Sequence, residues 1–269
     1  MSDETAAAFA AWERDSWEQR AQAYAAAFGD LTRGSIEALL DAAGVTAGTR
    51  LLDLGTGPGY VALVAAGRGA AVRAADQSQA MVRIAVEAGV DAVAADAEAL
   101  PFPDDDFDAV TASYLLNHLP RPEAAVYEMG RVLAPGGRLA LTIWDVPAVN
   151  AAIGSIGAVV AELGLAATVP DGPDPYRYTD EAPARDLLAS WDEVRSERVR
   201  WTIAVDPGWW FDVIADATPR TGAVLAQAGA ESRAEARRRY VETATARFGN
   251  GGGTVDLPAV AVLLSARRA

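Results

Sequence analysis

An apolar strand that runs into a glycine-rich turn is the feature that most constrains this chain. Residues 51 to 59 read LLDLGTGPG, so that Gly55, Gly57 and Gly59 follow the apolar run directly. Glycine lets the backbone turn sharply and approach a ligand closely. In open α/β proteins such a turn lies at the carboxyl end of a central strand, where ligands bind. The pattern therefore predicts a parallel sheet with a ligand at its carboxyl edge.

A carboxylate further along the chain narrows the choice of ligand. Asp76 follows Gly55 by about 20 residues, at the end of the next expected strand, where it can accept hydrogen bonds from ribose hydroxyls. The glycine spacing is not the G-x-G-x-x-G of dinucleotide-binding proteins, because Tyr60 stands where the last glycine is required. No Gly-Lys-Ser/Thr follows, which excludes a P-loop. The residues indicate a nucleoside cofactor of another kind.

Alternation of strands and helices from residue 50 predicts the architecture. The expected strands are 51–54, 71–75, 92–95, 108–112, 138–144, 194–205 and 259–264. The expected helices are two or three within 5–43, then 60–66, 78–88, 122–132, 150–165, 180–189 and 232–247. A turn is expected at residues 135–137, a cover segment at 207–220 and a flexible glycine connector at 249–253. Such alternation is typical of a parallel sheet with helices on both faces.

Composition excludes several classes of protein. A length of 269 residues suits one α/β domain with additions. The formal charge of −14 repels nucleic acid and anionic membranes, so neither is an expected partner. No run of 18 apolar residues occurs and the N-terminus lacks a basic start, which predicts a soluble cytoplasmic protein. Nothing in the sequence specifies an oligomeric state.

The missing residue types exclude further chemistry. All 23 basic residues are arginine and no cysteine is present, so lysine and cysteine catalysis cannot operate. His118 is the only histidine, which excludes metal motifs with two histidines, and no metal is expected. A Ser-His-Asp triad needs only one histidine, but the chain has no G-x-S-x-G turn.

Five motifs in a fixed order resemble those of class I S-adenosylmethionine-dependent methyltransferases. They are DLGTGPG at 53–59, DQS at 76–78 with Met81, DA at 96–97, LPFPDDDFD at 100–108 and LAPGGRL at 133–139. The branch most similar to this chain is that of the small-molecule enzymes related to the ubiquinone and menaquinone C-methyltransferases. The resemblance implies a Rossmann-like α/β fold, with a seven-strand, mostly parallel sheet, an antiparallel last strand and an inserted substrate cover. The single domain 1–269 would comprise a helical cover (1–45), a cofactor-binding core (46–145) and a substrate cover with the last strands (146–269).

The resemblance also implies contacts with the cofactor. Asp76 would accept from the ribose hydroxyls, and Asp96, beside Ala97, from the adenine amine, since carboxylates are acceptors and these groups are donors. Asp53 would order the turn or bind the cofactor's ammonium group, or only cap the turn. Further expected contacts come from Tyr24, Gly55, Thr56, Gly57, Gly59, Gln77, Met81 and Ser113. Tyr24 and Met81 have an ordinary core position as the alternative. The expected cofactor is S-adenosylmethionine, with S-adenosylhomocysteine as product and no metal ion.

The second half of the chain supplies candidates for binding the methyl acceptor. It is rich in aromatic residues, which predicts a small hydrophobic or aromatic acceptor held by apolar area rather than by charge. The candidate contacts are Trp144, Tyr178, Trp210 and Phe211, with packing of the cover helices as the alternative. His118 follows the fourth strand and either acts as a general base or orders its loop. A cyclase or pericyclase that binds the cofactor without transferring methyl remains the alternative function.

Overall fold

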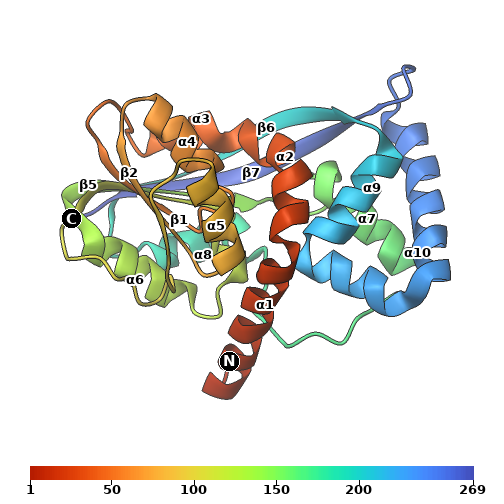
Figure 1. Cartoon of the computed structure of the whole chain (residues 1–269), viewed down its shortest axis with the longest axis horizontal. Coiled ribbons are helices and arrows are strands. Elements are labelled where there is room, and N and C mark those ends of the chain that lie inside the picture. The colour runs from red at the N-terminus through yellow and green to blue at the C-terminus, as the bar shows by residue number, and fades with distance from the viewer.

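The computed structural model describes residues 1–269 and contains one seven-stranded sheet, in the order β3-β2-β1-β4-β5-β7-β6 (Figure 1). The strands are β1 (Arg50–Leu54), β2 (Ala71–Asp76), β3 (Ala92–Ala94), β4 (Phe107–Ser113), β5 (Leu133–Trp144), β6 (Asp192–Val205) and β7 (Val255–Arg267). Strands β1 to β5 pair in parallel, and β7 runs antiparallel to both β5 and β6. The predicted fold class, including the antiparallel last strand, is confirmed.

Helices cover both faces of this sheet because its central strands, β1, β4, β5 and β7, are largely buried on both sides. The helices are α1 (Asp3–Ala27), α2 (Gly29–Thr32), α3 (Ile36–Ala42), α4 (Tyr60–Gly67), α5 (Gln79–Glu87), α6 (Pro122–Val132), α7 (Ala151–Glu162), α8 (Glu181–Leu187), α9 (Pro207–Ala217) and α10 (Pro219–Phe248). Successive side chains of a strand point to opposite faces. Leu51 accordingly packs with α3 and α4, whereas Leu52 and Leu54 pack with α6. No helix of the chain is long and apolar enough to span a bilayer.

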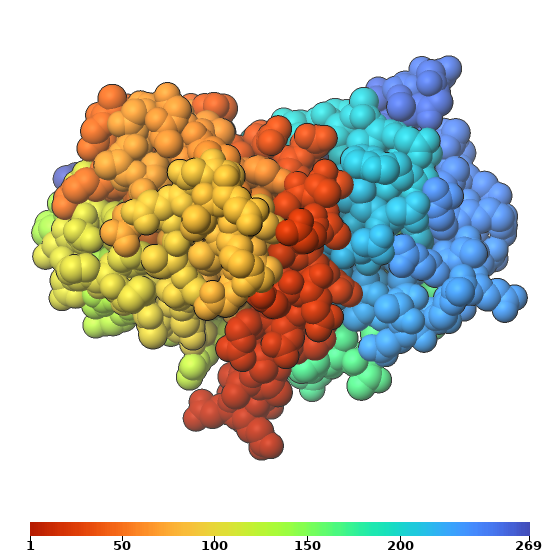
Figure 2. Space-filling view, viewed as in Figure 1, coloured from red at the N-terminus to blue at the C-terminus, as the bar shows by residue number.

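A second, helical body forms beside the sheet. The helices α7, α9 and α10 pack around the far ends of β6 and β7, and the C-terminal end of α1 joins them (Figure 1). Figure 2 shows α1, in red, running between this body and the sheet half of the molecule. The N-terminal helix thus contacts both halves, with α5 on one side and α9 on the other.

Three segments take a form that the sequence did not specify or that differs from the expectation. The expected turn at residues 135–137 lies within β5, as an irregularity where the pairing with β4 shifts register and Gly136 adopts a φ of +77°. The expected cover 207–220 is regular helix: Asp206 caps α9, and Pro207 and Pro219 occupy first helical turns, where proline is favoured. Helix α10 starts well before residue 232 and bends at Gly229, whose φ is +84°.

Candidate functional site

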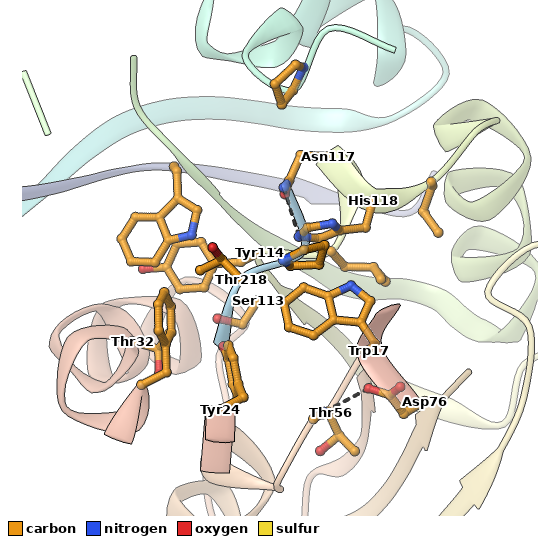
Figure 3. A pocket seen from close by; sticks show the side chains of 18 of the residues that line it. Trp17, Tyr24, Thr32, Thr56, Asp76, Ser113, Tyr114, Asn117, His118 and Thr218 are labelled. Atoms are coloured by element: carbon orange, nitrogen blue, oxygen red, sulfur yellow. Dashed lines mark hydrogen bonds between the residues drawn. The ribbon is translucent and has the colours of Figure 1, made fainter. Parts of the chain in front are cut away.

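A cavity lies at the carboxyl edge of β1, β2, β4 and β5, and α1 and the junction of α9 with α10 complete its walls. Figure 3 shows that its side chains come from segments far apart in the sequence. Twelve of the expected site residues line it: Tyr24, Asp53, Gly55, Thr56, Gly57, Asp76, Gln77, Asp96, Ala97, Ser113, His118 and Trp144. The chain therefore brings ten of the twelve expected cofactor contacts, His118 and one aromatic candidate into a single space.

Asp76 joins the glycine turn to the start of α5. One of its oxygens accepts the backbone N–H of Gly57 (2.9 Å) and the other that of Ser78 (2.9 Å). A carboxylate offers about four lone-pair positions, so each oxygen retains one for a ligand. Burial is the largest influence on this side chain and raises its pKa, while the two N–H donors oppose the shift. Asp76 can thus accept two further donors, as adjacent ribose hydroxyls would supply.

Asp53 lies beneath the glycine turn and is 1% exposed. Its oxygens accept the hydroxyls of Thr56 (2.6 Å) and Thr111 (3.0 Å), and so tie the turn to β4. Burial raises the pKa of Asp53 to about 6, although the two hydroxyl donors lower it. The side chain orders the turn and also lines the cavity. Its position is therefore compatible with either expected role, ordering the turn or binding the cofactor's ammonium group.

The raised pKa of Asp53 predicts a pH-dependent effect of Asp53→Asn. Between the ordinary value of 3.8 and about 6, the folded chain binds more protons at this site than the unfolded chain, so wild-type stability falls as pH rises. Asparagine does not titrate, so the Asp53→Asn variant does not lose stability in this way as the pH rises. We compare the free energy of unfolding of Asp53→Asn with that of the wild type at each pH. The variant minus wild-type difference should be higher at pH 7.5 than at pH 4.5, by on the order of 2 kcal/mol.

Urea unfolding at the two pH values measures this difference. The exposed Asp91, which pairs with Arg73 at the sheet edge, supplies the control Asp91→Asn. An effect of Asp53→Asn that does not change with pH would show that the carboxyl group does not resist ionisation.

Five expected site residues do not line the cavity. Gly59 begins α4 with a φ of +90°, and a Cβ there would meet Val90 at 2.8 Å, so this glycine serves the turn and its packing. Met81 is 3% exposed on the inner side of α5. The other three are the acceptor candidates Tyr178, Trp210 and Phe211.

Those three aromatic candidates are packing residues, which corrects the expectation from sequence. Tyr178 belongs to the core beside α6, and its hydroxyl donates to Glu123 (3.1 Å). Trp210 and Phe211 are both 0% exposed inside the helical body, where the Trp210 indole donates to the carbonyl of Ala152 (2.7 Å). Helix α9 turns its apolar face toward α7 and α10, so these rings stabilise the cover without reaching the cavity.

Other aromatic side chains line the cavity. Tyr114 stacks on Trp144 with centroids 3.8 Å apart and planes at 11°, and its hydroxyl is 2.7 Å from that of Ser35. Burial raises the pKa of Tyr114, so the phenol stays neutral. Tyr24 stacks on Phe28 at 4.7 Å and meets Trp17 edge-on at 5.4 Å. The sequence analysis missed Tyr114 and Trp17, although Tyr114 directly follows the expected residue Ser113.

His118 is held by a buried carboxylate from α1 that the sequence analysis also missed. Its Nδ1 lies 3.0 Å from Oε2 of Glu13, and the indole N–H of Trp17 donates to the same oxygen (3.1 Å). Since a carboxylate only accepts, Nδ1 carries the donated proton and Nε2 keeps a lone pair. The amide nitrogen of Asn117 lies 2.9 Å from Nε2 and donates to it (Figure 3). Glu13 is 0% exposed, and its Oε1 has no hydrogen-bond partner.

A second carboxylate of α1 fixes the helix against the cofactor end. Glu18 accepts the hydroxyl of Ser78 (2.8 Å) and the backbone N–H of Ala80 (2.9 Å) at the start of α5. These hydrogen bonds lower the pKa of Glu18. Ser78 also caps α5, as expected from the sequence, by accepting the N–H of Met81. Helix α1 is therefore anchored to the edge that carries Asp76, with Trp17 next to Glu18 and Glu13 rather more than one turn before it.

The hydrogen-bond acceptors at this edge suit a nucleoside without phosphate. Asp53, Asp76 and Asp96 line the cavity here, and carboxylates accept from hydroxyl, amine and ammonium groups but repel phosphate. A Cβ built on Gly57 would meet only Tyr24, at 4.0 Å, so space for a ligand remains above the turn. These residues fit S-adenosylmethionine and do not fit a dinucleotide.

Known proteins resemble the chain over the same region. Residues 52–141 match a family described as a methyltransferase domain. The demethylmenaquinone methyltransferase of Renibacterium salmoninarum is 34% identical over 165 residues, which cover 57% of this chain and 68% of that enzyme. Its counterpart from Clavibacter sepedonicus is 36% identical over 156 residues, covering 54% and 64%. The chain thus matches about two thirds of the length of these relatives.

Solved structures support the fold. The YcgJ protein of Bacillus subtilis has a TM-score of 0.57 at 21% identity, covering 88% of this chain and 98% of its own. A phosphoethanolamine N-methyltransferase of Haemonchus contortus, solved with S-adenosylhomocysteine, has a TM-score of 0.57 at 18% identity, covering 95% and 60%. At these identities the structural similarity shows only a shared fold. Membership of the family rests on the similarity in sequence to the methyltransferases above. The chain belongs to the class I S-adenosylmethionine-dependent methyltransferases, in the group related to the demethylmenaquinone methyltransferases.

Proposed function

We propose that this protein transfers the methyl group of S-adenosylmethionine to a small aromatic acceptor with an ionisable hydroxyl or carbon acid, and that His118 takes the acceptor's proton. One observation carries the proposal: the same cavity is lined by carboxylates suited to a nucleoside and by aromatic side chains beside His118. The names of the relatives, which act on demethylmenaquinone, agree with an aromatic acceptor.

The cofactor would be held by the edge of the sheet. Asp76 would accept from the ribose hydroxyls with the lone pairs that Gly57 and Ser78 leave free. Asp96, beside the buried Ala97, would accept from the adenine amine, and Asp53 would face the amino-acid end. Bound S-adenosylmethionine supplies a methyl group already activated on a sulfonium. The protein's main tasks are then to align the acceptor and to exclude water.

The aromatic end of the cavity would orient the acceptor ring. Tyr114 and Trp144 form one rigid wall, and Trp17, Tyr24 and Phe28 line the side formed by α1. Aromatic walls bind flat apolar ligands with little loss of side-chain freedom. Because α1 contributes both this wall and Glu13, the N-terminal cover would place the acceptor and the base together.

His118 would act through its Nε2 atom. Glu13 accepts the Nδ1 proton, which fixes the orientation and the tautomer of the ring. Neutral Nε2 has one lone pair, to which the amide nitrogen of Asn117 donates (2.9 Å), so Asn117 would have to move aside before the acceptor's proton can reach Nε2. Transfer of that proton would free the acceptor's O–H or C–H electron pair to form the new bond to carbon.

Product analysis tests this function directly. The purified protein is incubated with S-adenosylmethionine and a panel of hydroxynaphthalenes and phenols, and the products are separated by mass. We expect S-adenosylhomocysteine and an acceptor heavier by one CH₂ to form in equal amounts. A product isomeric with its substrate, without S-adenosylhomocysteine, would instead establish the cyclase alternative. Failure of both cofactor forms to bind in calorimetry would refute the proposed cofactor site.

A further inference from the structure

An unpaired guanidinium lines the acceptor side of the cavity. Arg220 lies in the first turn of α10, directly after the α9–α10 junction, and Thr218, Pro219 and Thr221 line the cavity with it. The junction is tethered from α1, because Nε of Arg20 donates to the carbonyl of Thr218 (3.1 Å). The backbone that carries Arg220 is therefore fixed by contacts outside the cavity.

The nitrogen atoms of Arg220 are buried without partners. Its Nε and Nη2 atoms are inaccessible to solvent and make no hydrogen bond, and no other arginine of the chain has such atoms. No carboxylate pairs with this side chain, whereas Asp145, the acidic residue lining the cavity near β5, is already paired with Arg198 (2.7 Å). Buried charged donors are costly unless they are hydrogen-bonded. The guanidinium therefore lacks a partner in the free protein, and it would have to turn toward the cavity for a ligand to reach these two atoms.

The two free atoms define the shape of the missing partner. Nε and Nη2 form one edge of the guanidinium plane, and their N–H bonds run nearly parallel, which is the arrangement that binds both oxygens of a carboxylate. Phe9 lies under the guanidinium at 5.5 Å and supports it by a cation–π contact. Tyr176 also lines the cavity; burial raises its pKa, and the positive charge of Arg220 opposes that rise.

The negatively and positively charged side chains lie in different parts of the cavity. Asp53, Asp76 and Asp96 lie at the edge assigned to the cofactor, and Arg220 is the only arginine among the lining residues. An anionic group would be repelled at one end and attracted at the other. This differs from the expectation that the acceptor is held by apolar area alone.

We infer that the methyl acceptor is an aromatic acid whose carboxylate binds the guanidinium of Arg220. This inference rests on the proposed function, because it names the acceptor class for the same cavity. The carboxylate would fix the ring at the end away from the cofactor carboxylates, and the aromatic walls would hold the ring itself.

The test uses a matched pair of probes, 2-naphthoate and its neutral isostere 2-naphthamide. Calorimetry is done on the full chain saturated with S-adenosylhomocysteine. We expect the wild type to prefer the acid by at least tenfold, and Arg220→Gln to lose that preference. Arg239→Gln, which changes an exposed arginine of the same helix that pairs with Glu235, should retain it.

The outcomes separate this inference from the proposed function. Equal affinities for the two probes, no naphthoate binding at millimolar concentration, or a preference that persists in Arg220→Gln would each overturn the inference while leaving the cofactor site intact. A loss of S-adenosylhomocysteine affinity in Arg220→Gln would overturn it too, by assigning the guanidinium to the carboxylate of the cofactor. Absence of S-adenosylhomocysteine binding to the wild type would contradict the proposed function instead.

Discussion

Replacing His118 with Asn is expected to lower kcat by about 100-fold or more at saturating substrates, within the range that general base catalysis contributes. The asparagine amide occupies roughly the place of Nδ1 and keeps a donor for Glu13, so the buried carboxylate stays paired. It offers no basic nitrogen where Nε2 stood. The loss should therefore fall on turnover, and the affinity for S-adenosylhomocysteine should change by less than about threefold, under 1 kcal/mol.

The pH–rate profile distinguishes a base from a residue that only orders its loop. In the wild type, turnover should rise with pH as the imidazole loses its proton, and this limb should be absent in His118→Asn. A loss of tenfold or less, with the limb retained, would mean that His118 serves only to order residues 116–118.

A second test of the Glu13–His118 pair replaces Glu13, which would act as a positioning residue for the imidazole ring. Glu13→Gln preserves size and a hydrogen-bond acceptor but removes the negative charge that stabilises the imidazolium. We expect kcat to fall by about tenfold with KM for the cofactor unchanged. Glu4→Gln, on the exposed first turn of the same helix, is the control and should have no effect. Equal rates for both variants would show that the buried charge plays no part in turnover.

Asp76→Ala is expected to weaken binding of S-adenosylmethionine and S-adenosylhomocysteine by about 10- to 100-fold, or roughly 1.4 to 2.8 kcal/mol. The substitution removes the acceptor for the ribose hydroxyls. It also leaves the N–H groups of Gly57 and Ser78 without their partner, so the glycine turn and the start of α5 loosen together. Both effects act on the cofactor edge.

Calorimetry with S-adenosylhomocysteine measures the effect, and circular dichroism verifies that the variant is folded. Asp91→Ala, at the exposed edge of the sheet, should bind like the wild type. An unchanged dissociation constant in folded Asp76→Ala would assign the ribose to another acceptor.

The sequence predicted the sheet and its cofactor edge because these depend on local patterns. Leu51 to Leu54 and the three glycines specify a buried strand followed by a tight turn, and Asp76 has to lie at the end of the adjacent parallel strand. Twelve of the expected residues accordingly line one cavity. The antiparallel last strand followed from the family resemblance.

The aromatic residues that line the cavity could not be predicted in this way. Trp210 and Phe211 read as a cover from their aromatic character, but the rotation of α9 about its axis determines that they point into the helical body. The sequence offers only a weak indication that Glu13 is buried. It lies four residues after Phe9 and four before Trp17, so it shares an apolar face of the helix with them. A buried acid on such a face requires a partner, yet helical spacing does not identify which one.

The sequence by itself determined the fold class, the carboxylate-lined cofactor edge and the exclusion of lysine, cysteine and multi-histidine chemistry. Only the tertiary structure decided that Glu13 meets His118 across 105 positions of the chain and that Arg220 enters the cavity unpaired. The physical reason is the separation along the sequence over which each effect acts: strand, turn and cap preferences depend on a few neighbouring residues. The pairing of a buried charge depends on how distant elements pack, and here the packing of α1 and the start of α10 against the sheet edge determines it.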